Sequence, residues 1–266
     1  MRGSAVVVLM VSALAFTGCA VAATPTGGLV ISVAAAASLR DAFSEAASRY
    51  QATHPGVTFQ LAFDASSALR TQIEQGAPVD VFASADTTNP QQLVDHGLAT
   101  GPVTPIARNE LVIVVPPSSA VASPAVAAPA DLGRPGVKII AAGPEVPITK
   151  YATQLVANLA RQPGYPADFI ARVAANTVSR EDNVRAILAK VALGEGDAGI
   201  VYVTDAHAAN VGTVAIPSTA NVVATYGAVA VKASSHPAGD RAFIDWLAGA
   251  EGQAVLARFG FLPRTE

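Results

Sequence analysis

The 266-residue chain contains one cysteine, Cys19, which excludes an intrachain disulfide. Charged residues are scarce at 14%, the net charge is −3, and no run of basic residues occurs. Nucleic-acid-binding proteins carry clustered positive charge, so this composition excludes binding to nucleic acid. The four histidines are scattered without the spacing of metal ligands and predict no cation site: His54, His96, His207 and His236.

Motifs of catalysis and nucleotide binding are also missing. No serine lies in a G-x-S-x-G sequence, and no phosphate-binding loop with its lysine occurs. Residues 194–199 match G-x-G-x-x-G, but they precede an expected strand instead of following one and opening a helix. We interpret them as the end of a helix and a turn. The sequence therefore predicts no cofactor and no catalytic residue.

The N-terminal segment has the features of an export signal. Arg2 is followed by an apolar stretch, residues 6–16, which is too short to span a membrane. We expect residues 1–18 to be a signal peptide. Phe16-Thr17-Gly18-Cys19 resembles a bacterial lipobox, whose cysteine becomes the lipid-modified first residue. This predicts an exported lipoprotein on the outer face of the cell membrane, with residues 19–28 as a flexible tether. The alternative is ordinary cleavage near residues 20–23, which would give a soluble product.

The rest of the chain alternates between strand-like and helix-like patterns. Hydrophobic residues make up 51% of the sequence, which is enough for a sizeable core. Strands are predicted at 29–33, 57–63, 79–82, 111–115, 137–141, 198–203 and 222–231, and helices at 39–50, 66–77, 148–159 and 184–191, with two more closing the chain. Strands separated by single helices favour a parallel, doubly wound α/β sheet, which binds ligands at the carboxyl ends of its strands. The pattern leaves open whether there is one sheet or two.

Two serines, Ser38 and Ser66, lie where a strand pattern gives way to a helix pattern. A helix that begins on a serine offers a hydroxyl and unpaired backbone N–H groups, with the positive end of its dipole toward the same point. Two such ends in one crevice would hold an anion without any charged side chain. The simpler alternative is that both serines only cap their helices.

Several segments, in order along the chain, resemble the molybdate-binding protein of bacterial ABC importers. They are residues 33–39, 66–85, 181–185, 199–202, 205–206 and 258–261, of which G-A-P-V-D-V-F at 76–82 followed by S-A-D at 84–86 is the most diagnostic. The resemblance covers almost all of the chain after the signal. It implies a type II periplasmic-binding-protein fold: two lobes, each a doubly wound mixed sheet flanked by helices, which close on the ligand by a hinge motion. Residues 29–109 and 225–266 would form one lobe and residues 110–224 the other.

The resemblance also implies the ligand contacts. Ser38 and Ser66 would donate hydroxyl and backbone N–H groups from the first lobe; the second would contribute the N–H groups of Ile148 and Val184 and the hydroxyl of Tyr202. All of these groups are hydrogen-bond donors. Molybdate, tungstate and sulfate are dianions near neutral pH that only accept hydrogen bonds. We therefore expect a monomer that captures molybdate or tungstate as an oxyanion, without a metal cation site, and delivers it to the membrane permease.

Charged residues near this constellation leave the choice of oxyanion open. Asp64 lies two residues before Ser66, and a carboxylate near a dianion costs energy unless it points away or carries a proton. It could instead accept a hydrogen bond from a protonated oxyanion such as phosphate, so sulfate and phosphate remain alternative ligands. Arg180 and Arg185 flank the expected ligand loop and are expected to face solvent.

Two other interpretations stay open at this point. An exported serine hydrolase would use Ser38 or Ser66 with His207 and an aspartate such as Asp205, although no motif supports that arrangement. Tyr202 could also be a core aromatic residue whose hydroxyl reaches water.

Overall fold

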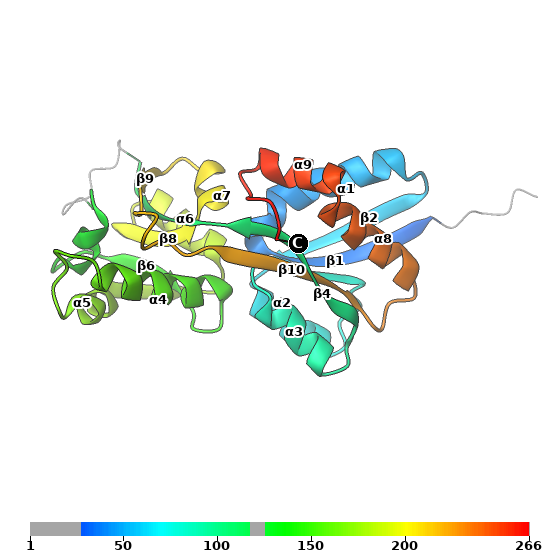
Figure 1. Ribbon diagram of the computed structural model, residues 1–266, viewed down its shortest axis with the longest axis horizontal. Helices are drawn as coiled ribbons and strands as arrows, with labels where there is room; N and C mark the ends of the chain where they lie inside the picture. The colour runs from blue at the N-terminus through cyan, green and yellow to red at the C-terminus, as the bar shows by residue number, and fades with distance from the viewer. Residues whose placement is uncertain (1–27, 118–125, 266) are drawn as a thin grey trace, which may run out of the picture.

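The computed structural model describes residues 28–117 and 126–265, so the predicted signal peptide and the lipid attachment at Cys19 lie outside the described residues. The described chain forms two five-stranded sheets, each covered by helices, which lie side by side along the long axis of the molecule (Figure 1). The predicted two-lobed α/β fold is confirmed. We call them the first and the second lobe, in the order in which the chain enters them.

The first lobe contains a sheet of strand order β2-β1-β3-β10-β4. Its strands are β1 (Leu29–Ala36), β2 (Val57–Asp64), β3 (Val81–Ser84), β4 (Ala99–Asn109) and β10 (Ala224–Val231). Its helices are α1 (Arg40–Thr53), α2 (Ser66–Glu74), α3 (Thr88–Asp95), α8 (Pro237–Ala248) and α9 (Ala250–Arg258), and a 3-10 turn, η1 (Ala37–Leu39), joins β1 to α1. β1 is parallel to β2 and β3, which places the turns carrying Ser38 and Ser66 at the same edge of the sheet.

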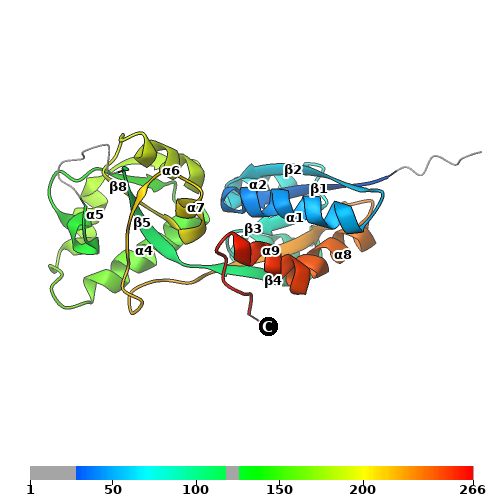
Figure 2. The ribbon, with the colours of Figure 1, turned by 90° about the horizontal axis from the view of Figure 1, so that it is seen from above.

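The second lobe contains a sheet of strand order β7-β6-β8-β5-β9. Its strands are β5 (Leu111–Val115), β6 (Ile139–Ala142), β7 (Thr177–Glu181), β8 (Ala198–Tyr202) and β9 (Gly212–Val214). Its helices are α4 (Pro147–Ala160), α5 (Phe169–Asn176), α6 (Val184–Ala192) and α7 (Val203–His207), with a 3-10 turn, η2 (Pro129–Gly133). The chain enters this lobe between β4 and β5 and returns between β9 and β10 (Figure 2).

The parallel sheet favoured by the strand–helix alternation is wrong for two strands, β10 and β5, whereas the mixed sheets implied by the resemblance are confirmed. β10 is antiparallel to β3 and β4, and β5 is antiparallel to β8 and β9. The prediction assumed a helix between consecutive strands, since a parallel pair needs a crossover. Only Glu110 separates β4 from β5, and no helix lies between β9 and β10. The mixed direction therefore arises where the chain crosses between the lobes.

The helix patterns read from the sequence are largely confirmed. In α1 the expected apolar face is buried, and the helix ends at His54 before Gly56, whose φ of +91° is readily adopted by glycine. Tyr50 of this face packs edge-on against Phe243 of α8, with ring centroids 5.2 Å apart. Such pairs contribute about 0.5–1.5 kcal/mol beyond the area that they bury. The segment 194–199 follows the end of α6 at Ala192 and includes a turn, with Gly194 at a φ of +76°, before β8 begins at Ala198, so its interpretation as the region of a helix end and a turn is confirmed up to residue 197.

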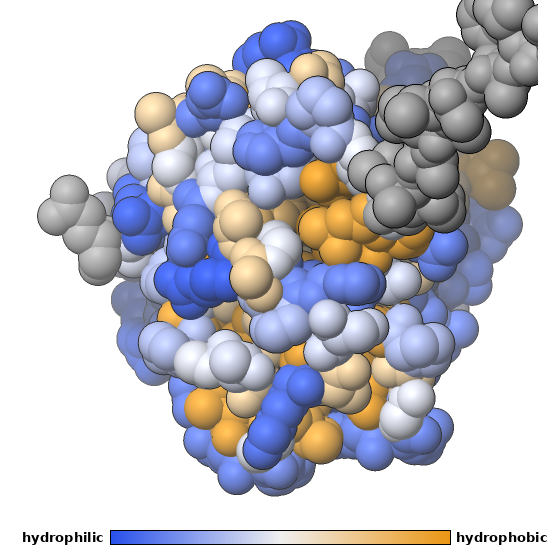
Figure 3. Space-filling model, turned by 90° about the vertical axis from the view of Figure 1, so that its right-hand side faces the viewer, coloured by the Kyte–Doolittle hydropathy of each residue, from blue (hydrophilic) through white to orange (hydrophobic). Residues whose placement is uncertain are grey.

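The outer surface of the first lobe is mixed in character. Figure 3 looks onto the end of this lobe, where hydrophilic side chains surround smaller apolar patches. Large exposed aliphatic side chains occur on separate elements of the described chain: Val30, Ile170, Val178, Leu193 and Val223. Within residues 28–117 and 126–265, no helix has both the length and the apolar character that a membrane span requires.

Candidate functional site

A small pocket between the lobes brings the five predicted site residues together. Ser38 and Ser66 approach it from the first lobe, and Ile148, Val184 and Tyr202 from the second. The complete lining is Ala36, Ala37, Ser38, Asp64, Ala65, Ser66, Ala85, Val146, Pro147, Ile148, Asn183, Val184 and Tyr202. Each of the five is at most 4% exposed. The residues implied by the resemblance therefore share one buried, interlobe location.

The two serines do not cap helices, contrary to the simpler alternative. Ser66 is the first residue of α2, and its Oγ accepts a hydrogen bond from the backbone N–H of Ala85 at 3.0 Å. The hydroxyl proton of Ser66 therefore remains available for donation to another acceptor. Ser38 lies in η1, and its Oγ is 3.0 Å from the hydroxyl oxygen of Tyr226, where either hydroxyl is able to donate. Both serine oxygens thus have a partner within the first lobe.

Three helices begin at the pocket. α2 begins at Ser66, α4 at Pro147 and α6 at Val184. The first N–H groups of a helix have no carbonyl partner within it, and the helix dipole places partial positive charge there. Asn183 caps α6, since its side chain accepts a hydrogen bond from the N–H of Ala186 at 3.2 Å. The N–H groups of Ile148 and Val184 belong to these first turns, and together the three ends favour an anion.

Tyr202 presents a hydroxyl that the rest of the described chain leaves unsatisfied. It is 1% exposed, and its hydroxyl oxygen has no hydrogen-bond partner among the described residues. Burial raises the pKa of Tyr202 well above its ordinary value, so the hydroxyl is a neutral donor. A buried hydroxyl without a partner costs about 1–3 kcal/mol. Its place in the pocket lining indicates a partner that arrives with the ligand.

Sequence reasoning missed a buried polar chain behind Ser38. Asn109, at the end of β4, donates from Nδ2 to Oγ1 of Thr204 at 2.8 Å, and the same nitrogen lies 3.4 Å from the hydroxyl of Tyr226. Asn109 and Tyr226 are fully buried. Tyr226 is 188 residues from Ser38, so no local pattern could have connected them. The strand expected at residues 222–231 indicates that Tyr226 is buried, but it does not indicate the partners of its hydroxyl.

The carboxylate of Asp64 lines the pocket but is engaged by protein donors. Its Oδ1 accepts from the N–H of Ala65 at 2.8 Å and from Nδ2 of Asn183 at 3.1 Å. The second bond joins the first lobe to the second. These two donors offset part of the cost of a carboxylate beside an anion site.

The expectation that Arg185 faces solvent is wrong, whereas Arg180 is exposed. Arg185 lies with Nη2 2.6 Å from Asp41 and Nε 2.8 Å from Asp205, which is fully buried. Burial raises the pKa of Asp205 to about 7, and the Arg185 guanidinium opposes that shift. A buried carboxylate at this position requires a cation beside it. The pairing of Arg185 could not be predicted from the local sequence, because Asp41 and Asp205 are distant from it along the chain.

These contacts also remove the arrangement that a serine hydrolase would need. Asp205 is paired with Arg185 rather than with His207, and the hydroxyl of Ser38 is paired with Tyr226. Within the described ranges, no group of three or more histidine, cysteine, aspartate or glutamate residues is placed to hold a metal ion. Apart from the carboxylate of Asp64, the polar side chains that line the pocket are uncharged.

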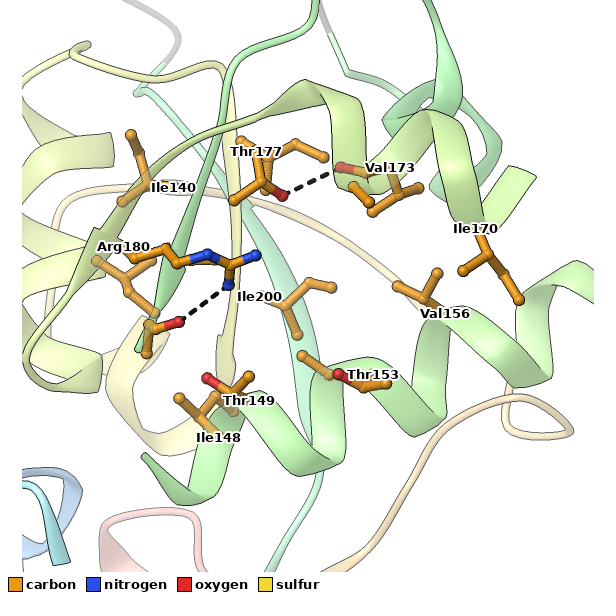
Figure 4. Close-up of a pocket in the computed structure, with 16 residues that line it drawn as sticks. Ile140, Ile148, Thr149, Thr153, Val156, Ile170, Val173, Thr177, Arg180 and Ile200 are labelled. Atoms are coloured by element: carbon orange, nitrogen blue, oxygen red, sulfur yellow. Dashed lines mark hydrogen bonds between the residues drawn. The ribbon is translucent and has the colours of Figure 1, made fainter. Parts of the chain in front are cut away.

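A larger cavity lies in the second lobe, between the sheet and helices α4 and α5 (Figure 4). Its volume is about 190 Å³, and its walls are mostly aliphatic. Arg180 extends across it, and its Nη1 donates to the carbonyl of Ala142 at 3.4 Å (Figure 4). Transferring a doubly charged anion to apolar walls is costly. The small interlobe pocket therefore remains the candidate site.

Two α/β lobes with a buried pocket between them define a solute-binding protein of the periplasmic type. The chain belongs to the family of bacterial extracellular solute-binding proteins, whose model matches residues 31–262. It is 38% identical to the molybdate-binding protein ModA of Mycobacterium tuberculosis, over 90% of this chain and 87% of that protein. It is 32% identical to ModA of Escherichia coli, over 87% of this chain and 88% of that protein. The resemblance found in the sequence is confirmed.

The fold is shared with a solved structure as well. The periplasmic molybdate-binding protein of Azotobacter vinelandii matches with a TM-score of 0.71 at 23% identity, over 87% of this chain and 98% of that one. At this identity the match shows the fold alone. Because the matching family consists of extracellular solute-binding proteins and the relatives are named molybdate-binding proteins, the chain is a binding protein and not an enzyme, as predicted.

Proposed function

We propose that the protein binds molybdate, and also tungstate, between its lobes and delivers the oxyanion to the permease of an ABC importer. The observation that carries this proposal is the buried hydroxyl of Tyr202, which has no partner among the described residues and lines the same pocket as two serines and three helix starts. The similarity to ModA proteins supports molybdate as the ligand.

In the proposed complex the dianion accepts hydrogen bonds only from neutral groups. Ser38 and Ser66 each contribute a hydroxyl and a backbone N–H, Ile148 and Val184 each a backbone N–H, and Tyr202 its hydroxyl. A hydrogen bond to a charged group contributes about 1.5–3 kcal/mol. Several such bonds, together with the helix dipoles, offset the desolvation of the anion and the ordering of the lobes.

The partners of the serines support their role as donors. The oxygen of Ser66 already accepts from the N–H of Ala85. In our proposal Tyr226 donates to Ser38, while the amide of Asn109 donates to Tyr226. Both serine protons are then turned toward the ligand. A cavity in which donors face the ligand favours an anion without protons over one that must itself donate.

Asp64 bears on the choice between oxyanions. A protonated oxyanion such as hydrogen phosphate needs an acceptor, and because Oδ1 of Asp64 already accepts two hydrogen bonds, mainly Oδ2 is left for that role among several donors. We therefore propose that phosphate binds weakly. Sulfate carries the same charge as molybdate and has the same acceptor pattern, so size decides between these two anions.

Calorimetric titration of the purified protein tests the ligand. We expect molybdate and tungstate to bind with one site per chain, and sulfate and phosphate to bind more weakly. Competition among the four anions at constant ionic strength separates size from charge. Phosphate binding more tightly than molybdate, or no heat with either molybdate or tungstate, would contradict the proposal.

We further propose that residues 29–109 together with residues 225–266 form one lobe, which moves as a single body against the other lobe, residues 110–224. We also propose that the protein acts as an exported monomer.

We propose that the protein is anchored by lipid. Residues 1–18 would be removed, Cys19 would carry the lipid at the outer face of the membrane, and residues 19–28 would form the tether. The lipobox-like residues 16–19 support this anchoring. Metabolic labelling with a fatty acid tests it: wild type should be labelled and Cys19→Ala should not. Equal labelling of both would refute lipidation at Cys19.

A further inference from the structure

Arg185 joins the two lobes by an ion pair. Ion pairs such as Arg49 with Glu45, or Lys190 with Glu181, join neighbouring residues within one lobe. Arg185 lies in α6 of the second lobe, and its Nη2 is 2.6 Å from Oδ2 of Asp41 in α1 of the first lobe. Opening the lobes must separate these two charges.

The other end of the Arg185 guanidinium is fixed within its own lobe. Its Nε lies 2.8 Å from Oδ1 of Asp205, in the short helix α7. Asp205 is fully buried, and separating it from the guanidinium would leave an unpaired buried charge. Arg185 therefore stays with the second lobe when the lobes part, and the contact to Asp41 is the one that breaks. The planar fork of arginine allows both contacts at once.

The contacts to the first lobe bracket one ligand-facing residue. Asn183 donates to Asp64 of the first lobe at 3.1 Å, and Arg185 pairs with Asp41. Val184 lies between them at the start of α6 and lines the pocket. Bonds on both sides of Val184 thus hold the start of α6 against the first lobe.

We propose that Arg185 is a positioning residue that latches the closed lobes through Asp41 and so holds the N–H of Val184 against the oxyanion. The inference rests on the proposed function but adds a residue that does not touch the ligand. Both ends of the guanidinium already face carboxylates, which explains how a cation close to an anion site leaves the binding to neutral donors.

The strength of the latch depends on salt. The Arg185 and Asp41 side chains are 24% and 42% exposed, and both line a cavity of about 360 Å³ beside Ser38. Dissolved ions reach such a pair and screen it. The latch should therefore slow release of the ligand most strongly at low ionic strength.

The test compares two variants of helix α1 in the full protein. Asp41→Asn removes the interlobe charge, while Glu45→Gln removes a carboxylate of similar exposure that pairs with Arg49 and Arg258 inside the first lobe. Release of molybdate is followed by stopped-flow displacement at low and high salt. We expect Asp41→Asn to release molybdate about three- to tenfold faster at low salt, with a smaller difference at high salt, and Glu45→Gln to match wild type. Thermal unfolding without ligand checks that both variants are folded.

The outcomes separate this inference from the proposed function. Equal release rates for wild type and Asp41→Asn at low salt would overturn the latch and leave the ligand assignment intact. Equal acceleration in Asp41→Asn and Glu45→Gln would also overturn it, because the effect would then be one of general surface charge. Failure of wild type to bind either molybdate or tungstate would overturn the proposed function, and the latch with it.

Discussion

The hydroxyl of Tyr202 gives the sharpest prediction, because its removal should have opposite effects on stability and on binding. In the ligand-free protein this hydroxyl is buried and has no partner among the described residues. Tyr202→Phe removes the unsatisfied group and keeps the ring, which packs edge-on against Tyr226 with centroids 5.5 Å apart. We therefore expect the ligand-free variant to be at least as stable as wild type.

The magnitudes follow from the hydrogen bond. A buried unsatisfied hydroxyl costs about 1–3 kcal/mol, so we expect the ligand-free variant to gain about 1 kcal/mol, or roughly 2–4 °C in Tm. In the complex the hydroxyl donates to a dianion, which contributes about 1.5–3 kcal/mol. Losing that bond should weaken molybdate binding by about 10- to 100-fold.

Calorimetric unfolding without ligand and titration with molybdate measure the two effects separately. Tyr165→Phe is the control, because Tyr165 packs edge-on against Phe169 of the same lobe, with centroids 4.8 Å apart, and does not line the pocket. Its affinity should equal that of wild type. Unchanged affinity in Tyr202→Phe would remove the hydroxyl from the binding site, and a large loss of ligand-free stability would show that it has a structural partner.

Of three further predictions, two concern residues around the pocket and one concerns a residue outside it. Ser66→Ala leaves the N–H of Ala85 without its partner, so both ligand-free Tm and molybdate affinity should fall, and an unchanged Tm would contradict this. Tyr226→Phe should weaken molybdate binding about tenfold in titration although Tyr226 does not line the pocket, because Ser38 loses its orienting donor; equal affinity would refute that orientation. Burial raises the pKa of Asp240 to about 6, so its charged form is disfavoured in the folded state, and its contribution to stability is lost as pH rises through 6. Asp240→Asn should therefore gain Tm relative to wild type as pH rises from about 4 to 6, with little further change up to pH 8, and Tm curves that run parallel between pH 4 and pH 6 would contradict this.

The elements that the sequence predicted well are those specified by local pattern. Helix α1 shows its apolar face every three to four residues, and it begins one residue and ends three residues beyond the predicted bounds. The strand directions could not be predicted in the same way. β10 reaches the first sheet from the other lobe, so its antiparallel pairing with β3 depends on a long-range crossing that periodicity does not encode.

The same distinction between local pattern and long-range contact applies to the residues of the candidate site. Ser38 and Ser66 are predicted from the sequence because each lies at the start of a helical segment, where backbone N–H groups lack carbonyl partners, whereas Val184 is implied only by the resemblance. Tyr226 and Arg185 were missed or misplaced because their partners lie 188 and 144 residues away. Contacts between the lobes exist only once the lobes meet, and they leave no signature in the neighbouring sequence.

A crystal structure of the protein soaked with molybdate tests the central claim most directly, because the anomalous signal of molybdenum locates the ion without ambiguity. The account predicts a single ion in the interlobe pocket, with its oxygens roughly 3 Å from the hydroxyls of Ser38, Ser66 and Tyr202 and from the N–H groups of Ile148 and Val184. An ion held by lysine or arginine side chains, or located away from Ser38 and Ser66, would contradict it.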